Sequence, residues 1–166
     1  MNTNDTFQSA ALKNHPQSIL SRTRRMINVL YVGDNTKDFD IFRGQMALMG
    51  LASLRSFTPK TDSSELIDYL DKNKQDPLDA IFVDIRMPLV DGAKILRIMK
   101  LHPQYNIIPV ILISAWKTCF EFVKIMCPDF KADGYLLRPI SLAELSTILE
   151  VISTGRSRVP DLGEHD

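Results

Sequence analysis

Residues 81–88 of the chain read Ile81-Phe82-Val83-Asp84-Ile85-Arg86-Met87-Pro88. An apolar run ends in a carboxylate, and an Asp91-Gly92 turn follows the proline. This pattern predicts a buried parallel strand that delivers one acid to the edge of a sheet. In open α/β folds, ligands bind at the carboxyl ends of the strands. Asp84 is therefore the first candidate for a functional residue.

Length and composition fit one domain with a buried core, because the chain has 166 residues. The 20 basic and 20 acidic side chains balance, so no overall field favours nucleic acid or acidic lipid. No apolar run is long enough to span a membrane. Cys119 and Cys127 lack the spacing of a metal site, so we expect reduced thiols and a cytoplasmic protein.

The two ends of the chain differ in character from its middle. Residues 1–25 are rich in Asn, Ser, Thr and Gln, and we expect a disordered leader there. Their arginines and scarcity of acids leave a transit peptide as the alternative. Residues 26–153 are expected to fold, and residues 154–166 to form a polar tail.

Apolar strand-like segments alternate five times with amphipathic segments. Strands are expected at residues 26–32, 52–57, 78–84, 107–113 and 135–137, with a helix after each. Asn35 or Thr36 can cap the first helix, and Gly50 can end it. Such alternation predicts an α/β fold, in which helices cover both faces of a parallel sheet through right-handed crossovers.

Four of the expected strands end in polar side chains, Asp34, Asp84, Ser114 and Arg138. In a parallel sheet these ends converge on one crevice. Asp34 and Asp84 offer oxygens suited to Mg²⁺, and a carboxylate beside a metal can attack a phosphoryl group. The Ser114 hydroxyl and the Arg138 guanidinium can then hold phosphoryl oxygens.

Five motifs at these strand ends resemble the receiver domain of two-component response regulators. In chain order they are Gly33-Asp34-Asn35, Val83-Asp84, Met87-Pro88 with Asp91-Gly92, Ser114-Ala115, and Ala132-Asp133-Gly134-Tyr135-Leu136-Leu137-Arg138-Pro139. The resemblance covers about residues 26–153. It implies a flavodoxin-like (βα)5 doubly wound sheet with strand order 2-1-3-4-5. It also implies a cis peptide before Pro139.

The resemblance also implies roles by position. Asp84 corresponds to the phosphoacceptor, and Asp34 and the backbone carbonyl of Arg86 correspond to Mg²⁺ ligands. Ser114 corresponds to the switch hydroxyl, and Tyr135 to the aromatic ring that turns inward with it. We therefore expect a stand-alone signalling switch and not an enzyme.

The partners are implied by the same resemblance. A histidine kinase or phosphotransfer protein would donate the phosphoryl group to Asp84. A separate downstream protein would recognise the face formed by the fourth helix, fifth strand and fifth helix. That face could also form a homodimer.

Two residues depart from the family pattern. Gly33 stands where the family has the first residue of an acidic pair, and such a loss weakens metal binding by about 10–100-fold. Arg138 stands where the family has lysine. It can grip a phosphoryl group, or it can pair with Asp84 in the resting state and mask it. The alternative function is therefore a phosphorylation-independent interaction or dimerisation module.

The expected fourth helix, residues 117–127, carries more apolar side chains than one buried face can hold. Either the leader covers this helix, or the surplus forms an exposed patch for a partner or a second copy of the chain. Trp116, which precedes the helix, could control access to Asp84 or pack over the loop.

Overall fold

The computed structural model describes residues 26–50, 52–88 and 90–155, so the leader and most of the tail expected from the sequence lie outside the described residues. The strands are β1 (Ile27–Val32), β2 (Ala52–Phe57), β3 (Ala80–Asp84), β4 (Val110–Ser114) and β5 (Gly134–Leu137). The helices are α1 (Thr36–Met49), α2 (Glu65–Lys72), α3 (Gly92–Leu101), α4 (Lys117–Met126) and α5 (Leu142–Ser153). None of the helices in these ranges is long and apolar enough to cross a bilayer.

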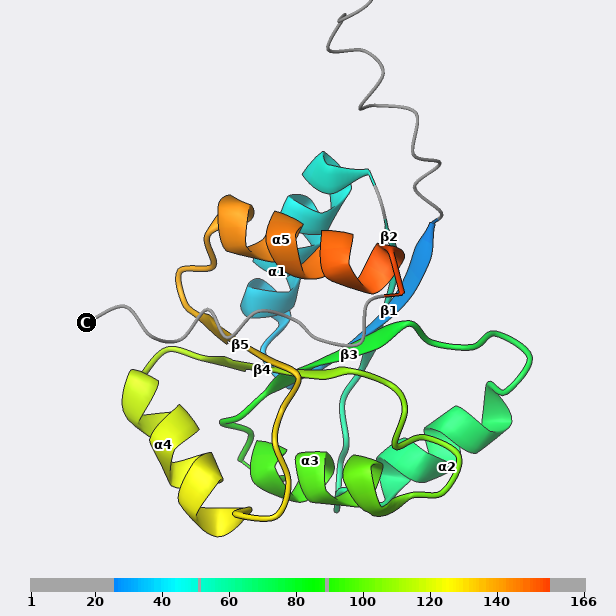
Figure 1. The fold of residues 1–166 in the computed structure, drawn as a ribbon, viewed down its shortest axis with the longest axis vertical. Coiled ribbons are helices and arrows are strands. Elements are labelled where there is room, and N and C mark those ends of the chain that lie inside the picture. Colours follow the sequence, from blue (N-terminus) through cyan, green and yellow to red (C-terminus); the bar gives the residue numbers. More distant parts are fainter. Residues whose placement is uncertain (1–25, 51, 89, 156–166) are drawn as a thin grey trace, which may run out of the picture.

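All pairs of neighbouring strands in the sheet are parallel, and their order is β2-β1-β3-β4-β5. This order confirms the doubly wound (βα)5 prediction. Helices α1 and α5 cover one face of the sheet, and α2, α3 and α4 cover the other (Figure 1). The peptide between Arg138 and Pro139 is cis.

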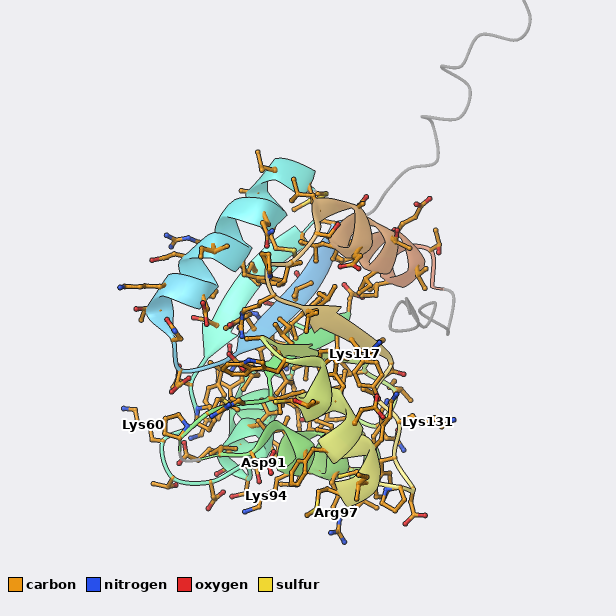
Figure 2. All side chains as sticks on the ribbon, turned by 90° about the vertical axis from the view of Figure 1, so that its left-hand side faces the viewer. Lys60, Asp91, Lys94, Arg97, Lys117 and Lys131 are labelled. Carbon is orange, nitrogen blue, oxygen red and sulfur yellow. The ribbon has the colours of Figure 1, made fainter. Side chains whose placement is uncertain are left out.

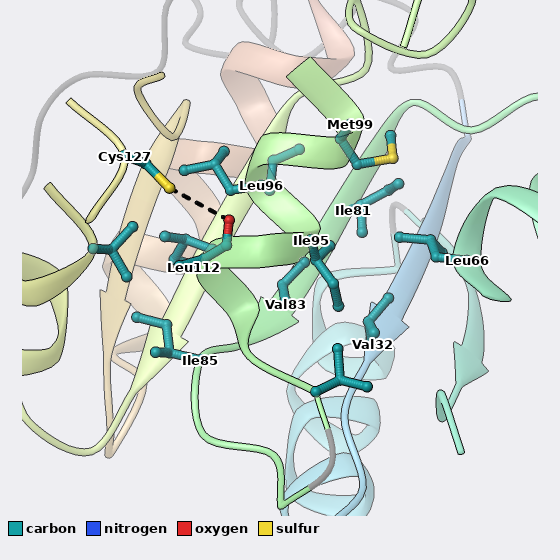
Figure 3. Close-up of a cluster of buried hydrophobic side chains, with 14 of the residues drawn as sticks. Val32, Leu66, Ile81, Val83, Ile85, Ile95, Leu96, Met99, Leu112 and Cys127 are labelled. Atoms are coloured by element: carbon teal, nitrogen blue, oxygen red, sulfur yellow. Dashed lines mark hydrogen bonds between the residues drawn. The ribbon is translucent and has the colours of Figure 1, made fainter. Parts of the chain in front are cut away.

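Each face of the sheet has its own hydrophobic core. Towards α1 and α5, buried side chains include Tyr31, Phe42 and Phe82. On the other face, Ile81 and Val83 of β3 pack with the inner side of α3 (Figure 3). The Cys127 thiol donates a 3.5 Å hydrogen bond to the carbonyl of Ala93 in this second core. Alternate residues of the central strands thus serve two cores, which explains their unbroken apolar runs.

Local sequence signals set the ends of the helices. The Asn35 side chain accepts hydrogen bonds from the backbone N–H groups of Lys37 and Asp38, at 3.0 and 3.3 Å, and so caps α1. Gly50 follows α1 with φ 60°, a left-handed conformation that favours glycine. Asp91 caps α3 by accepting a 2.9 Å hydrogen bond from the Ala93 N–H.

Strand β4 begins later than the sequence suggested. The expected strand started at Ile107, but Ile107 is 84% exposed and the strand starts at Val110. Pro109 has no N–H to donate, although its carbonyl accepts a 2.9 Å hydrogen bond from Ile81. The apolar run was therefore a poor guide to where strand pairing begins.

Helix α2 ends before Asp76-Pro77, although proline is the usual signal for the end of a helix. Its last residue is Lys72, and the Asn73 side chain donates a 2.7 Å hydrogen bond to the carbonyl of Tyr69. This bond satisfies a carbonyl that the end of the helix leaves without a partner. The short polar side chain, and not the proline, closes the helix.

Gly92 lies where α3 meets the loop after β3. A Cβ at this position would lie 2.7 Å from the Cα of Ile85 and 3.1 Å from the carbonyl oxygen of Asp84. We expect Gly92→Ala to lower the free energy of unfolding by about 1–3 kcal/mol, because backbone must shift to admit the methyl group. Urea unfolding followed by circular dichroism measures this change.

Gly44 is the matched control, because a Cβ there would meet nothing within 4 Å. It lies inside α1, so Gly44→Ala should raise the free energy of unfolding by about 0.5–1 kcal/mol. Equal changes in the two variants would contradict the close approach at Gly92.

Candidate functional site

The register of the sheet brings the ends of four strands together. β1 pairs with β3, β3 with β4, and β4 with β5, all in parallel. Asp84 ends β3 beside Gly33, which follows β1. Ser114 ends β4, and Arg138 follows β5. Four segments that are far apart in sequence therefore supply one edge of the sheet.

Asp84 is only 4% exposed, and both of its carboxylate oxygens accept hydrogen bonds. Oδ1 accepts from the backbone N–H of Arg86 at 3.0 Å. Oδ2 accepts from Nη2 of Arg138 at 2.8 Å. A charge buried to this degree is costly unless it is paired and hydrogen-bonded, and these two contacts meet that requirement.

A single nitrogen of the Arg138 side chain, Nη2, makes its hydrogen bonds and ion pairs with other described residues. Nη2 donates to the Tyr31 hydroxyl at 2.9 Å as well as to Asp84, and it lies 3.6 Å from Oδ2 of Asp38. Burial of Arg138 lowers the pKa of its guanidinium. The hydrogen bond to Asp84 and the negative charge of Asp84 outweigh this effect, so the pKa is raised. Of the two alternatives for this arginine, the structure displays the resting ion pair.

Tyr31 is a member of this site that the sequence analysis missed. Its side chain is 1% exposed, and its ring centroid lies 5.5 Å from that of Phe39 and 5.2 Å from that of Phe42. A tyrosine in a strand of aliphatic residues is easily assigned to the core. The available signal was its spacing from Gly33, because residues two apart in a strand share a face.

Ser114 and Tyr135 face a different environment. The Ser114 hydroxyl oxygen accepts a 3.1 Å hydrogen bond from the Trp116 N–H, and its residue is 1% exposed. Tyr135 is partly buried, and its ring meets that of Phe120 edge-on at 5.1 Å between centroids. The Lys124 ammonium lies 5.6 Å from the centre of the same ring. These two residues are therefore linked to α4, whereas Arg138 is linked to β1.

The carboxylates suit Mg²⁺ in number but not in their present contacts. Asp34 is exposed, and it makes no hydrogen bond to another described residue. Within the described ranges, no three His, Cys, Asp or Glu side chains are arranged to hold a metal ion. Mg²⁺ needs only one or two protein carboxylates, because it keeps several of its waters. A metal at Oδ2 of Asp84 would first have to displace Arg138.

A cavity of about 610 Å³ opens beside Asp84 without including it. Its wall is formed by Ile85, Arg86, Met87, Pro88 and Asp91 on one side and by Thr118, Cys119 and Phe122 on the other. The Arg86 guanidinium lies over the Trp116 ring at 4.7 Å from its centre, a cation–π contact. This contact joins the loop after β3 to the start of α4.

Helix α4 leaves large apolar side chains exposed within the described part of the chain. Phe122 is 51% exposed, Ile125 74% and Met126 56%, whereas Phe120 and Val123 are buried. Within the described residues, the surplus of apolar side chains noted in the sequence is therefore exposed, and the alternative that the leader covers it lies outside those residues. The neighbouring helix α3 presents charged side chains such as Lys94 and Arg97, which point away from the sheet (Figure 2).

Residues 29–150 match the family model of the response regulator receiver domain. The chain therefore belongs to the response regulator receiver family. It is 24% identical over 155 residues to the peroxide stress-activated histidine kinase mak1 of Schizosaccharomyces pombe. That alignment covers 90% of this chain but 9% of the kinase, so the chain spans less than a tenth of that relative.

Solved structures show the same fold. A response regulator from Chloroflexus aurantiacus aligns with a TM-score of 0.62 and 17% identity, over 78% of this chain and 99% of its own. The receiver domain of a sensor histidine kinase from Pseudomonas aeruginosa aligns with a TM-score of 0.58 and 23% identity, over 77% and 98%. The latter is described with a magnesium ion coordinated in its active-site cleft.

The Tyr31 hydroxyl gives the site a signature at alkaline pH. Burial raises the pKa of Tyr31 to about 12, against the opposing effect of the Arg138 cation. A pKa raised in the folded state stabilises the fold below the ordinary tyrosine value of about 10, and this contribution is lost as the pH rises towards 12. We expect Tyr31→Phe to make the decline in stability between pH 10 and pH 12 less steep.

Urea midpoints measured across this interval test the expectation. Tyr105, whose pKa burial and Asp71 also raise to about 12, should keep its own share of the decline in both proteins. If stability declined equally steeply in the wild type and in Tyr31→Phe, the raised pKa of Tyr31 would not be a cause of the alkaline decline.

Proposed function

We propose that this receiver accepts a phosphoryl group on Asp84 from a phosphohistidine donor in two-component signalling. The observation that carries the proposal is the buried Asp84 carboxylate at the end of the central strand, with Arg138 2.8 Å from Oδ2 and Ser114 at the end of the next strand. Receiver domains are signalling modules, so the product of this step is a changed protein surface.

The transfer uses groups of this chain in a simple order. When Arg138 turns away from the carboxylate, Oδ2 of Asp84 is free to attack the phosphorus of the donor. The new O–P bond forms as the P–N bond to the donor histidine breaks, and the imidazole leaves with the electron pair of that bond. Oδ1 stays bound to the Arg86 N–H, which keeps the carboxylate oriented.

Arg138 changes partner during this step. Its Nη2 gives up an oxygen of the carboxylate and can bind an oxygen of the phosphoryl group, because arginine presents several donors in one plane. The phosphoryl group carries about −1.5 to −2 charges, and it replaces the single negative charge of the Asp84 carboxylate. The cation that masks Asp84 at rest would thus stabilise the phosphorylated form.

Mg²⁺ is the cofactor that this donor set would use. Asp34, Asp84 and the backbone carbonyl of Arg86 would hold it, and it would offset the repulsion between carboxylate and phosphoryl group. Gly33 supplies no carboxylate for a metal-bound water, so we expect binding about 10–100-fold weaker than with an acidic residue there. Competition from Arg138 would weaken it further.

The signal would pass to the face formed by α4, β5 and α5. Ser114 is bonded to the backbone of Trp116 at the start of α4, and Tyr135 packs on Phe120 within α4. A shift of the Ser114 hydroxyl towards the phosphoryl group would break the first contact and change the packing of the second. A downstream protein, or a second copy of the chain, would then bind this face with altered affinity.

A second candidate function is a phosphorylation-independent interaction module. The specific observation in its favour is that each oxygen of Asp84 already accepts a hydrogen bond, Oδ1 from the Arg86 N–H and Oδ2 from Arg138. The hydrogen bond from Arg138 to the Tyr31 hydroxyl holds the second of these contacts closed. The exposed apolar side chains of α4 would then bind a partner constitutively.

Intact mass spectrometry separates the two candidates. The full chain is incubated with a small acyl phosphate and Mg²⁺ at a concentration high enough to overcome weak binding. We expect one phosphoryl adduct in the wild type and none in Asp84→Asn, which removes the nucleophile but keeps the shape of the side chain. Asp129→Asn, which removes an exposed carboxylate outside the site, is the matched control and should still yield an adduct.

An adduct that persists in Asp84→Asn would place the chemistry elsewhere. The absence of any adduct at saturating Mg²⁺ would favour the constitutive module.

A further inference from the structure

We propose that Tyr31 is a positioning residue of this receiver. The Tyr31 ring occupies the space that a side chain at position 33 would need, and the Tyr31 hydroxyl holds Arg138 against Asp84. The inference deepens the proposed function and rests on Asp84 being the phosphoacceptor. Tyr31 would then couple the two departures from the family pattern, Gly33 and Arg138.

The space beside Gly33 belongs to Tyr31. A Cβ built on Gly33 would lie 2.6 Å from Cε1 of Tyr31, 3.1 Å from Cζ and 3.2 Å from the hydroxyl oxygen. All three of its nearest atoms thus belong to the Tyr31 side chain, and the two nearest are ring carbons. The backbone conformation does not demand glycine, because the positive-φ glycines of the described ranges are Gly50 and Gly155. The lack of space beside Tyr31, and not the backbone conformation, therefore explains why residue 33 is glycine.

Neither residue can move apart cheaply. The Tyr31 ring is 1% exposed and is flanked by the two phenylalanine rings of α1. The Gly33 backbone is tied to the end of β2, because its N–H donates to the carbonyl of Phe57 at 3.2 Å and its carbonyl accepts from the Thr58 hydroxyl at 2.6 Å. A side chain at position 33 would therefore overpack a filled region.

The hydroxyl of Tyr31 determines where Arg138 points. Nη2 carries two hydrogens, and its hydrogen bonds go to the Tyr31 hydroxyl at 2.9 Å and to Oδ2 of Asp84 at 2.8 Å. With both hydrogens committed, rotation of the guanidinium away from Asp84 breaks two bonds and not one. A metal ion or a phosphoryl donor must overcome both.

The first test measures Mg²⁺ binding to the full chain through the fluorescence of Trp116, its single tryptophan. Four proteins are compared: wild type, Tyr31→Phe, Arg138→Met and the double variant. We expect Tyr31→Phe to tighten Mg²⁺ binding by about threefold to tenfold, because a hydrogen bond that retains the competing cation is lost. Arg138→Met should tighten it at least as much, and Tyr31→Phe should add nothing in that background.

The same four proteins are unfolded in urea without metal, which measures the coupling between Tyr31 and Arg138 independently of Mg²⁺. A positioning role requires Tyr31→Phe to cost stability with Arg138 present and to cost little without it. Equal effects of Tyr31→Phe in both backgrounds, in binding and in unfolding, would overturn the positioning role.

The second test concerns the space at position 33. Gly33→Ala should raise the unfolding equilibrium constant about tenfold or more in the wild type and in Tyr31→Phe, which keeps the ring. In Tyr31→Val it should change that constant by less than about twofold, because the ring is gone. Tyr31→Leu replaces Tyr31→Val if the latter does not fold. The same cost of Gly33→Ala in every background would overturn the explanation of Gly33.

The two levels of the proposal fail in different ways. If no protein of the set binds Mg²⁺ or gains a phosphoryl group, the proposed function fails, while the unfolding experiments still decide the role of Tyr31. If the wild type gains the group but the couplings vanish, the function stands and the positioning role is wrong.

Discussion

The structure depends on how one buried carboxylate is satisfied. Asp84 lies at the end of the central strand, where burial makes an unpaired charge costly. Arg138 neutralises it from the end of β5, and Tyr31 supports the arginine from β1. The ion pair therefore links strands from both halves of the sheet. Removing one partner of such a pair is costly, because the other charge is then left buried and unpaired.

This arrangement gives the site two separate sides. Tyr31 and Asp38 contact Arg138 on the side of α1, whereas Ser114 and Tyr135 connect the same edge to α4. The contacts on the first side would control access to Asp84. The contacts on the second side would transmit the effect of phosphorylation to α4. The exposed apolar surface lies on the second side, on α4, which fits a face intended for another protein.

The fold could be predicted from sequence because its signals are local and repeated. Apolar runs such as residues 81–83 marked the strands, and Gly50 marked the end of a helix. The same reasoning failed at Ile107, where an apolar run lies outside the strand and is exposed. Pro109 lacks the N–H that would continue strand pairing towards Ile107, so the run extends beyond the strand.

The site was harder to predict than the fold. Asp84 and Arg138 could be placed at one edge from topology, and their ion pair was one of two alternatives. The part played by Tyr31 could not be derived, because it depends on a hydrogen bond between residues 107 positions apart in sequence. Gly33 was interpreted only as a lost carboxylate, since a sequence does not show which neighbouring ring fills the space.

A crystal structure of the metal-free full chain would test the central claim most directly. The account predicts that Nη2 of Arg138 lies within hydrogen-bond distance of both Oδ2 of Asp84 and the Tyr31 hydroxyl. An Arg138 side chain turned into solvent, with Asp84 open and Tyr31 bonded elsewhere, would contradict it.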